Sequence, residues 1–88
     1  MKLDVTQRDI VRSQRRKQVS ERLKTCENEN EVVDILFYIP PELRITCVLD
    51  IEEVMCGSNL EEICSQNPWM SKFNLQKIYQ KLRDLGLI

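Results

Sequence analysis

SKFNLQKIYQKLRDLG, residues 71–86, is the stretch that decides the fold class. Its apolar side chains recur at spacings of three and four residues, and polar side chains fill the positions between them. The apolar set is Leu75, Ile78, Tyr79, Leu82 and Leu85. This pattern predicts an amphipathic α-helix with one face on a core. Serine caps helix starts and glycine ends helices, so we expect this helix to begin at Ser71 and to stop at Gly86.

A second amphipathic pattern runs from Pro41 to Gly57. Proline suits the first turn of a helix, and a glycine after the last turn ends one. The spacings of three and four recur here, and the residues expected to face the core are Leu43, Cys47, Val48, Ile51, Val54 and Met55. The acidic residues expected on the opposite face are Asp50, Glu52 and Glu53.

Between these two helices the sequence predicts a short one, from Leu60 to about Gln66, capped by Ser58 or Asn59. Its expected inner face is Leu60, Ile63 and Cys64. Asn67-Pro68 then breaks the helical pattern. We expect Trp69 and Phe73 to close the core beside this break, with the alternative that an exposed Trp69 marks a surface for a partner.

The apolar run between Asn28 and Pro40 allows two interpretations. Asn28 and Glu31 have the spacing of a helix N-terminus, whereas the density of apolar residues from Val32 to Ile39 also fits a buried strand. We favour a helix, because no second strand is evident to pair with a first. Pro40-Pro41 ends the element in either case.

Residues 1–26 form the first of two expected parts, a basic N-terminal helix or arm, and residues 27–88 form a helical domain. Thr6 followed by Asp9 is a plausible helix start, and no glycine or proline interrupts the segment. Residues 12–18 contain no apolar side chain. We therefore expect the front of this segment to be exposed or loosely attached.

Charge is segregated along the chain, although the net charge is only −1. Residues 1–24 carry eight Lys and Arg against three acids, residues 25–66 carry one Arg against ten acids, and residues 67–88 carry four Lys and Arg against one acid. The basic ends can contact a polyanion, or they can pair with the acidic middle within one chain or between two. A third interpretation is that these are three solvated faces that happen to differ.

Composition excludes several classes of protein. With 88 residues the chain has room for one small core, and no apolar run approaches the length of a membrane span. The N-terminus lacks a signal-peptide pattern, so we expect a cytoplasmic protein that does not contact a membrane. Histidine is absent, and the four cysteines, which contain no C-x-x-C pair, are expected to be reduced and to pack as apolar side chains: Cys26, Cys47, Cys56 and Cys64. We therefore expect no enzyme, no metal and no cofactor.

The run from Leu43 to Ile88 resembles the core of a winged helix-turn-helix domain. Residues 57–64, GSNLEEIC, look like that family's entrance to its second helix, where Cys64 is the small residue that lets two helices cross. Ser71 stands where the family caps its recognition helix, and residues 82–88, LRDLGLI, are similar to its exit toward the wing. Two departures are a turn at residues 67–70 without the customary glycine and a sequence that stops where the wing is expected.

The resemblance implies a small all-α regulator of transcription that binds double-stranded DNA, with a homodimer as a natural form. The recognition helix from Ser71 is then expected to contact DNA through Lys72, Asn74, Gln76, Lys77 and Lys81. The basic N-terminal residues expected to contact phosphate or a second protomer are Arg12, Arg15, Arg16 and Lys17. The alternative is a protein–protein interaction module, a small inhibitor or adaptor, that binds through its acidic middle or its C-terminal edge.

Overall fold

The computed structural model describes residues 5–88, with side chains from residue 10 onward. These residues form five α-helices and one short 3₁₀-helix, and no strand occurs among them. The elements are α1 (Val5–Leu23), α2 (Glu29–Tyr38), α3 (Pro41–Met55), α4 (Leu60–Gln66), η1 (Pro68–Ser71) and α5 (Leu75–Asp84). The predicted small all-α domain is confirmed, and the run between Asn28 and Pro40 is a helix rather than a strand.

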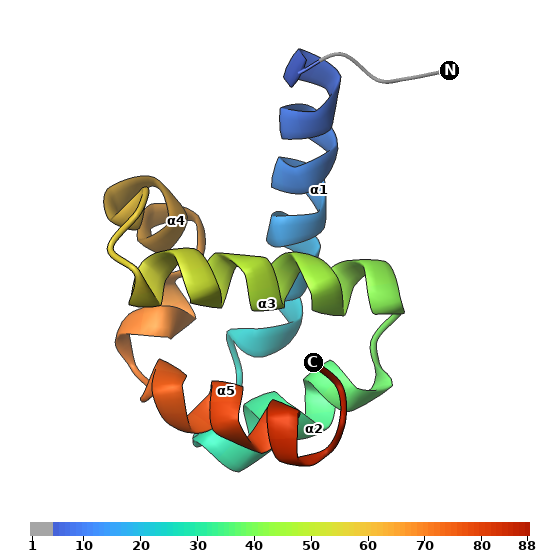
Figure 1. Cartoon of the computed structure of the whole chain (residues 1–88), viewed down its shortest axis with the longest axis vertical. Helices are drawn as coiled ribbons and strands as arrows, with labels where there is room; N and C mark the ends of the chain where they lie inside the picture. The colour runs from blue at the N-terminus through green and yellow to red at the C-terminus, as the bar shows by residue number, and fades with distance from the viewer. Residues whose placement is uncertain (1–4) are drawn as a thin grey trace.

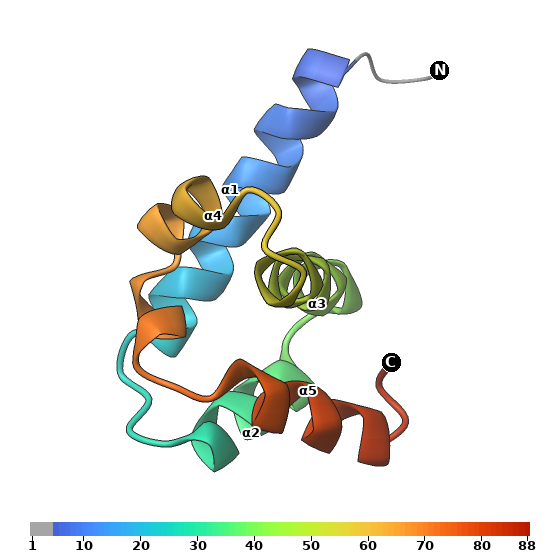
Figure 2. The same cartoon turned by 60° about the vertical axis from the view of Figure 1, so that its left-hand side comes forward.

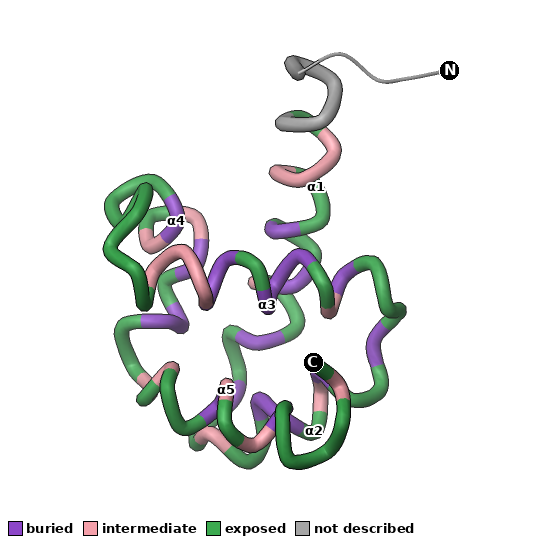
Figure 3. Tube along the Cα trace, in the orientation of Figure 1, coloured by how far each residue is buried: buried purple, intermediate pink, exposed green. Residues whose placement is uncertain are grey.

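Helix α3 crosses the middle of the molecule and packs against α1 on one side and α5 on another (Figures 1 and 2). Helix α5 also packs against α2, whereas α4 and η1 lie beside α1. The first turns of α1 project beyond the other helices (Figure 1). Figure 3 colours the chain by burial. The buried residues lie on the inward sides of α2, α3 and α5 and on one side of the second half of α1.

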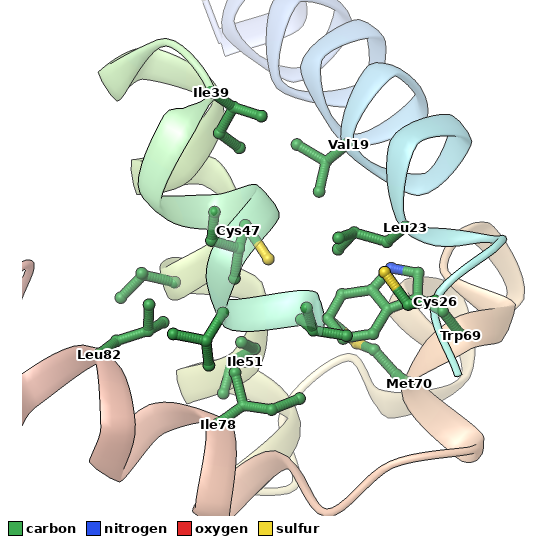
Figure 4. Packing of buried hydrophobic residues seen from close by; sticks show 14 of the residues in the cluster. Val19, Leu23, Cys26, Ile39, Cys47, Ile51, Trp69, Met70, Ile78 and Leu82 are labelled. Atoms are coloured by element: carbon green, nitrogen blue, oxygen red, sulfur yellow. The ribbon is translucent and has the colours of Figure 1, made fainter. Parts of the chain in front are cut away.

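A single apolar cluster joins every element (Figure 4). Helix α1 contributes Val19 and Leu23, and α5 contributes Ile78 and Leu82. The other elements contribute Val32, Val33, Leu36, Leu43, Cys47, Val48, Ile51, Ile63, Trp69 and Met70. The burial of Trp69 confirms that it closes the core, and its indole Nε1 donates a hydrogen bond to Asn67 Oδ1 at 3.2 Å. Trp69 is therefore not a surface for a partner.

The amphipathic stripes are buried in their middles and exposed at their ends. Met55 is the last residue of α3, Leu60 is the first of α4, and Leu85 follows α5; all three are exposed, contrary to the sequence prediction. Cys56 is also exposed, and Cys64 is half-buried. Helix periodicity predicts which face turns inward, but the length of the neighbouring helices decides where that face stops being covered.

Local signals correctly predicted several helix ends. Asn28 Oδ1 accepts the hydrogen bond of the Glu31 N–H at 3.0 Å and so caps α2. Pro41 is the first residue of α3. Gly57 follows α3 with a positive φ of 79°, and the next N–H, that of Ser58, donates to the Glu53 carbonyl at 2.9 Å. Glycine adopts this left-handed conformation without strain, which explains why α3 ends here.

The predicted cap of the last helix is wrong, whereas Asn59 stands at the predicted N-cap position of α4. The chain after Asn67 forms η1, so Ser71 ends that 3₁₀-helix and its hydroxyl donates to the Pro68 carbonyl at 2.9 Å. Helix α5 begins at Leu75, and Asn74 caps it by accepting from the Lys77 N–H at 3.2 Å. Asn59 precedes α4, but its side chain makes no capping bond. At the front of the chain Thr6 is already helical, and its side chain lies outside those described.

Candidate functional site

The five residues of the C-terminal part expected to contact DNA do not form one free face. Lys72 and Gln76 are exposed, whereas Asn74 uses its side-chain oxygen to cap α5. Lys81 Nζ donates to Asn30 Oδ1 on α2, and Lys77 Nζ lies 3.9 Å from Glu29 Oε1 on the same helix. Two lysines expected to meet phosphate or base edges are therefore turned toward the acidic start of α2.

An open polar groove of about 570 Å³ runs along this side of α5. It brings together four of the five predicted residues, and Lys72 is not part of it. The groove is lined by Asn74, Gln76, Lys77, Gln80, Lys81 and Asp84. Gln80 Nε2 donates to Asp84 Oδ1 at 3.0 Å, so that part of the lining is already hydrogen-bonded.

The four basic residues of α1 that were expected to contact phosphate divide into two pairs. Arg15 and Lys17 are exposed, as expected for contacts with a polyanion. Arg16 is buried: its Nε donates to Asp50 Oδ2 at 2.7 Å and its Nη2 to Asp50 Oδ1 at 3.0 Å. Arg12 Nη2 reaches the same Asp50 Oδ1 at 2.9 Å. The expectation that the front of the N-terminal segment is exposed or loosely attached is therefore wrong for Arg16, which is buried, and Arg12 is half-buried.

Asp50 is the partner that the sequence prediction put on the wrong face of α3. Only 1% of this residue is exposed, because it points toward α1 and meets both arginines. Burial alone lowers the pKa of Arg12, but hydrogen bonds and charges from Asp50 and Glu53 outweigh that effect and raise it. The missed signal is a matched spacing: Arg12 and Arg16 share one helix face, and Asp50 and Glu53 share another.

A recess of about 280 Å³ lies beside this ion-pair network, between α1, α3 and α4. Arg12 and Arg16 line it, but both already hold Asp50, and Arg12 also lies 3.2 Å from Glu53. Glu62 adds a further negative charge to the lining. The charges of both arginines at this recess are thus paired with carboxylates, and the network fastens α1 to α3.

Two of the four cysteines are buried, and none belongs to a metal-binding cluster in the described part of the chain. No group of three or more cysteine or carboxylate side chains is placed to hold a metal ion among residues with described side chains. Burial, and then the charge of Asp50, raises the pKa of the Cys47 thiol. Burial and the charge of Glu31 likewise raise the pKa of Cys26. A protonated thiol is a poor nucleophile and a poor metal ligand.

An exposed aromatic pair at the end of α2 is a feature that the sequence reasoning missed. Tyr38 is 82% exposed and Phe37 is 46% exposed, and their rings meet edge to face with centroids 5.1 Å apart. Arg44 Nη1 lies 3.4 Å from the carbonyl oxygens of Leu36 and Phe37, which ties α3 to this end of α2. Large aromatic side chains that remain exposed in a folded domain are typical of binding surfaces.

The outer face of α3 is also apolar. Ile45 and Leu49 lie one helical turn apart, and both are exposed. The predicted core stripe did not include them, so their exposure agrees with the helical periodicity. Isoleucine and leucine are also common core residues, so residue type alone did not indicate that these two are exposed. Their exposure adds to the apolar surface that the described helices leave uncovered.

Comparison with protein-family models, curated proteins and solved structures finds no match to this chain. Within residues 5–88, no helix combines the length and apolar character needed to cross a membrane.

Proposed function

We propose that this protein is a protein–protein interaction module. The observation that carries the proposal is the exposed aromatic pair, in which Tyr38 is almost fully accessible beside Phe37. Such side chains combine a large apolar area with few rotatable bonds, and in interfaces they contribute much of the binding free energy. In a small domain that buries its tryptophan, an unburied tyrosine and phenylalanine at one helix end indicate a surface that meets another protein.

The polar groups support the same proposal, because several residues suited to DNA already have partners within the chain. Arg12 and Arg16 bind Asp50, Asn74 caps α5, and Lys81 binds Asn30. The exposed residues of the acidic middle would repel a polyanion that approached α2 or α4. Binding to a protein, unlike binding to DNA, does not require a positively charged surface.

The test is capture of a partner by the immobilised full chain from a lysate of the cells that express it, compared across variants. Tyr38→Ala should lower retention of the captured protein about tenfold or more, as expected for an aromatic anchor. Leu60→Ala is the control, because it shortens another exposed large apolar side chain, which lies on α4 rather than on α2. Equal retention by wild type and Tyr38→Ala, with helix content unchanged, would contradict the proposal.

DNA binding is the second candidate, and the polar groove along α5 is the observation that favours it. In this function Gln76 and Lys72 reach base edges or phosphates, and Arg15 and Lys17 add contacts from α1. A titration against mixed duplex DNA at two salt concentrations tests it, since phosphate-dominated binding weakens steeply with salt. If Gln76→Ala, Lys72→Ala and Lys77→Ala all bind DNA with the affinity of the wild type, α5 and the residues just before it do not contact the bases.

A further inference from the structure

Asp34 lies on the outer side of α2 between two grooves, and it lines both of them. The first groove, of about 290 Å³, runs between α2 and α5 and is lined by Asn30, Val33, Asp34, Lys81, Asp84 and Leu85. The second, of about 230 Å³, runs between α2 and the end of α1 and is lined by Arg22, Asp34, Ile35, Tyr38 and Ile39. The exposed Tyr38 is thus part of a larger surface on α2.

The first groove combines an apolar floor with unequal charges. Val33 and Leu85 supply the apolar part. Two carboxylates, Asp34 and Asp84, face a single positive charge on Lys81, and Lys81 Nζ is hydrogen-bonded to Asn30. Among the residues with described side chains, Asp34 has no hydrogen-bond or ion-pair partner. The groove therefore fits a long side chain with an apolar stem and a positive end, which is the structure of arginine or lysine.

The second groove is more apolar. Ile35, Ile39 and the ring of Tyr38 line it together with Arg22 and Asp34, and no ion pair joins these two charged side chains in the described part of the chain. This groove fits an apolar side chain. Since Asp34 lines both grooves, the two adjoin at this residue.

We propose that the outer face of α2 binds a partner segment in which a basic residue has apolar neighbours. The basic side chain lies on Val33 and Leu85 with its charged end between Asp34 and Asp84, and an apolar neighbour enters the second groove against Tyr38. This inference rests on the proposed function and names the chemistry of the partner. It makes Asp34 the residue that selects a basic side chain.

The test uses the isotope-labelled full chain and short peptides as probes. Acetyl-Leu-Arg-Leu-amide should shift the backbone NMR signals of residues 30–39 and of Leu85, with an affinity of about 1 mM, as expected for a small ligand on an open surface. Acetyl-Leu-Glu-Leu-amide and acetyl-Ser-Arg-Ser-amide each lack one feature of the proposed segment. Both should bind about tenfold or more weakly.

Matched charge variants identify the selecting residue. Asp34→Asn should weaken binding of the arginine peptide about tenfold, whereas Glu61→Gln, which neutralises an exposed carboxylate on α4, should leave it unchanged. Equal binding of the arginine and glutamate peptides, or no effect of Asp34→Asn, would overturn the inference. Concentration-dependent shifts of residues 30–39 in the protein alone, with a dimer in sedimentation, would also overturn it by assigning the face to a second copy.

This result is separable from that of the proposed function. Partner capture that depends on Tyr38, together with no preference for the arginine peptide, leaves the interaction module in place and removes the basic segment. Selective binding of the arginine peptide, together with capture that ignores Tyr38, supports the groove chemistry but removes the aromatic pair as the anchor of the proposed function.

Discussion

Asp50 shares its carboxylate between Arg16 and Arg12, and burial makes this arrangement sensitive to the loss of one charge. Asp50→Asn keeps the size of the side chain but leaves the buried Arg16 guanidinium without a counter-charge. We expect it to lower the free energy of unfolding by about 3–5 kcal/mol, measured by urea denaturation. Many small domains have only about 5–15 kcal/mol in total, so the variant should be close to unfolding.

Glu53→Gln is the matched control for this prediction. Glu53 lies 3.2 Å from Arg12, and both side chains are partly accessible to water. Its replacement should cost about 1 kcal/mol or less, since solvent screens such a pair. Equal urea midpoints for Asp50→Asn and wild type would show that α1 is held without this carboxylate.

Two cysteine thiols, one within α3 and one just after its last residue, should differ in reactivity. Burial raises the pKa of Cys47, whereas Cys56 is exposed. A thiol reagent added to the folded protein at about pH 8 should therefore modify Cys56 before Cys47, because the thiolate is the reactive form. Mass spectrometry of the digested protein measures the order, and modification of Cys47 first would contradict its burial in the core.

The raised pKa of Cys47 also predicts how the free energy of unfolding changes at alkaline pH. Above its ordinary pKa of 9.0 the thiol loses its proton in the unfolded chain but keeps it in the folded one. The folded state then binds more protons, so the free energy of unfolding should fall as the pH rises above about 9. Urea midpoints at rising pH should show a smaller decrease in Cys47→Ala than in wild type, and identical slopes would contradict this assignment.

At the scale of the helix, the structure and the sequence prediction differ in the residue that caps α5, which is Asn74 in the structure and Ser71 in the prediction. Asn74→Ala removes the acceptor of the Lys77 N–H and should lower the free energy of unfolding by about 1 kcal/mol. Ser71→Ala removes only a hydrogen bond within η1 and should change it by about 0.5 kcal/mol or less. Thermal melts of the two variants measure the difference. A larger loss of stability in Ser71→Ala than in Asn74→Ala would indicate that Ser71 caps the helix, as the sequence predicted.

Helix ends were predictable where the signal is local to the chain. Asn28, Pro41 and Gly57 act within one turn of their own position, so the sequence alone was sufficient for α2 and α3. The start of α5 was missed because the residues before it form η1, which holds Trp69 in the core. Burial of that ring is a tertiary effect, and it overrides the capping preference of Ser71.

At the scale of the whole molecule, the described contacts that hold α1 run from Arg12 onward: Arg12 pairs with Asp50 and Glu53, and the buried residues of α1 begin at Arg16. Deleting residues 1–9 removes no member of the buried cluster and no described partner of Asp50, so the melting temperature should stay within a few degrees of wild type. Deleting residues 1–16 also removes Arg12 and Arg16 and should leave a largely unfolded chain. Circular dichroism measures both, and a stable fold in the shorter chain would show that the Arg12 and Arg16 ion pairs are dispensable.

The binding surfaces were less predictable than the fold. Charge segregation correctly raised internal pairing as one alternative, but Arg16 and Asp50 are 34 residues apart, and no periodicity says which charges meet at that distance. The grooves beside Asp34 are formed between α1, α2 and α5, so they depend on how these three helices pack together. Phe37 and Tyr38 belong to an apolar run whose exposed side is decided by where α1 and α5 pack on α2.

The shared carboxylate of Asp50 also limits how this sequence can diverge over time. A change at position 50 alone leaves the buried Arg16 guanidinium without a counter-charge, and a change at position 16 alone leaves the buried Asp50 carboxylate with Arg12 as its one described charged partner, so each single step is selected against. Replacement of the set by apolar side chains of similar volume is tolerated energetically, but only when the changes come together. Homologous chains should therefore show positions 12, 16 and 50 covarying, either all three polar with the charges retained or all three apolar.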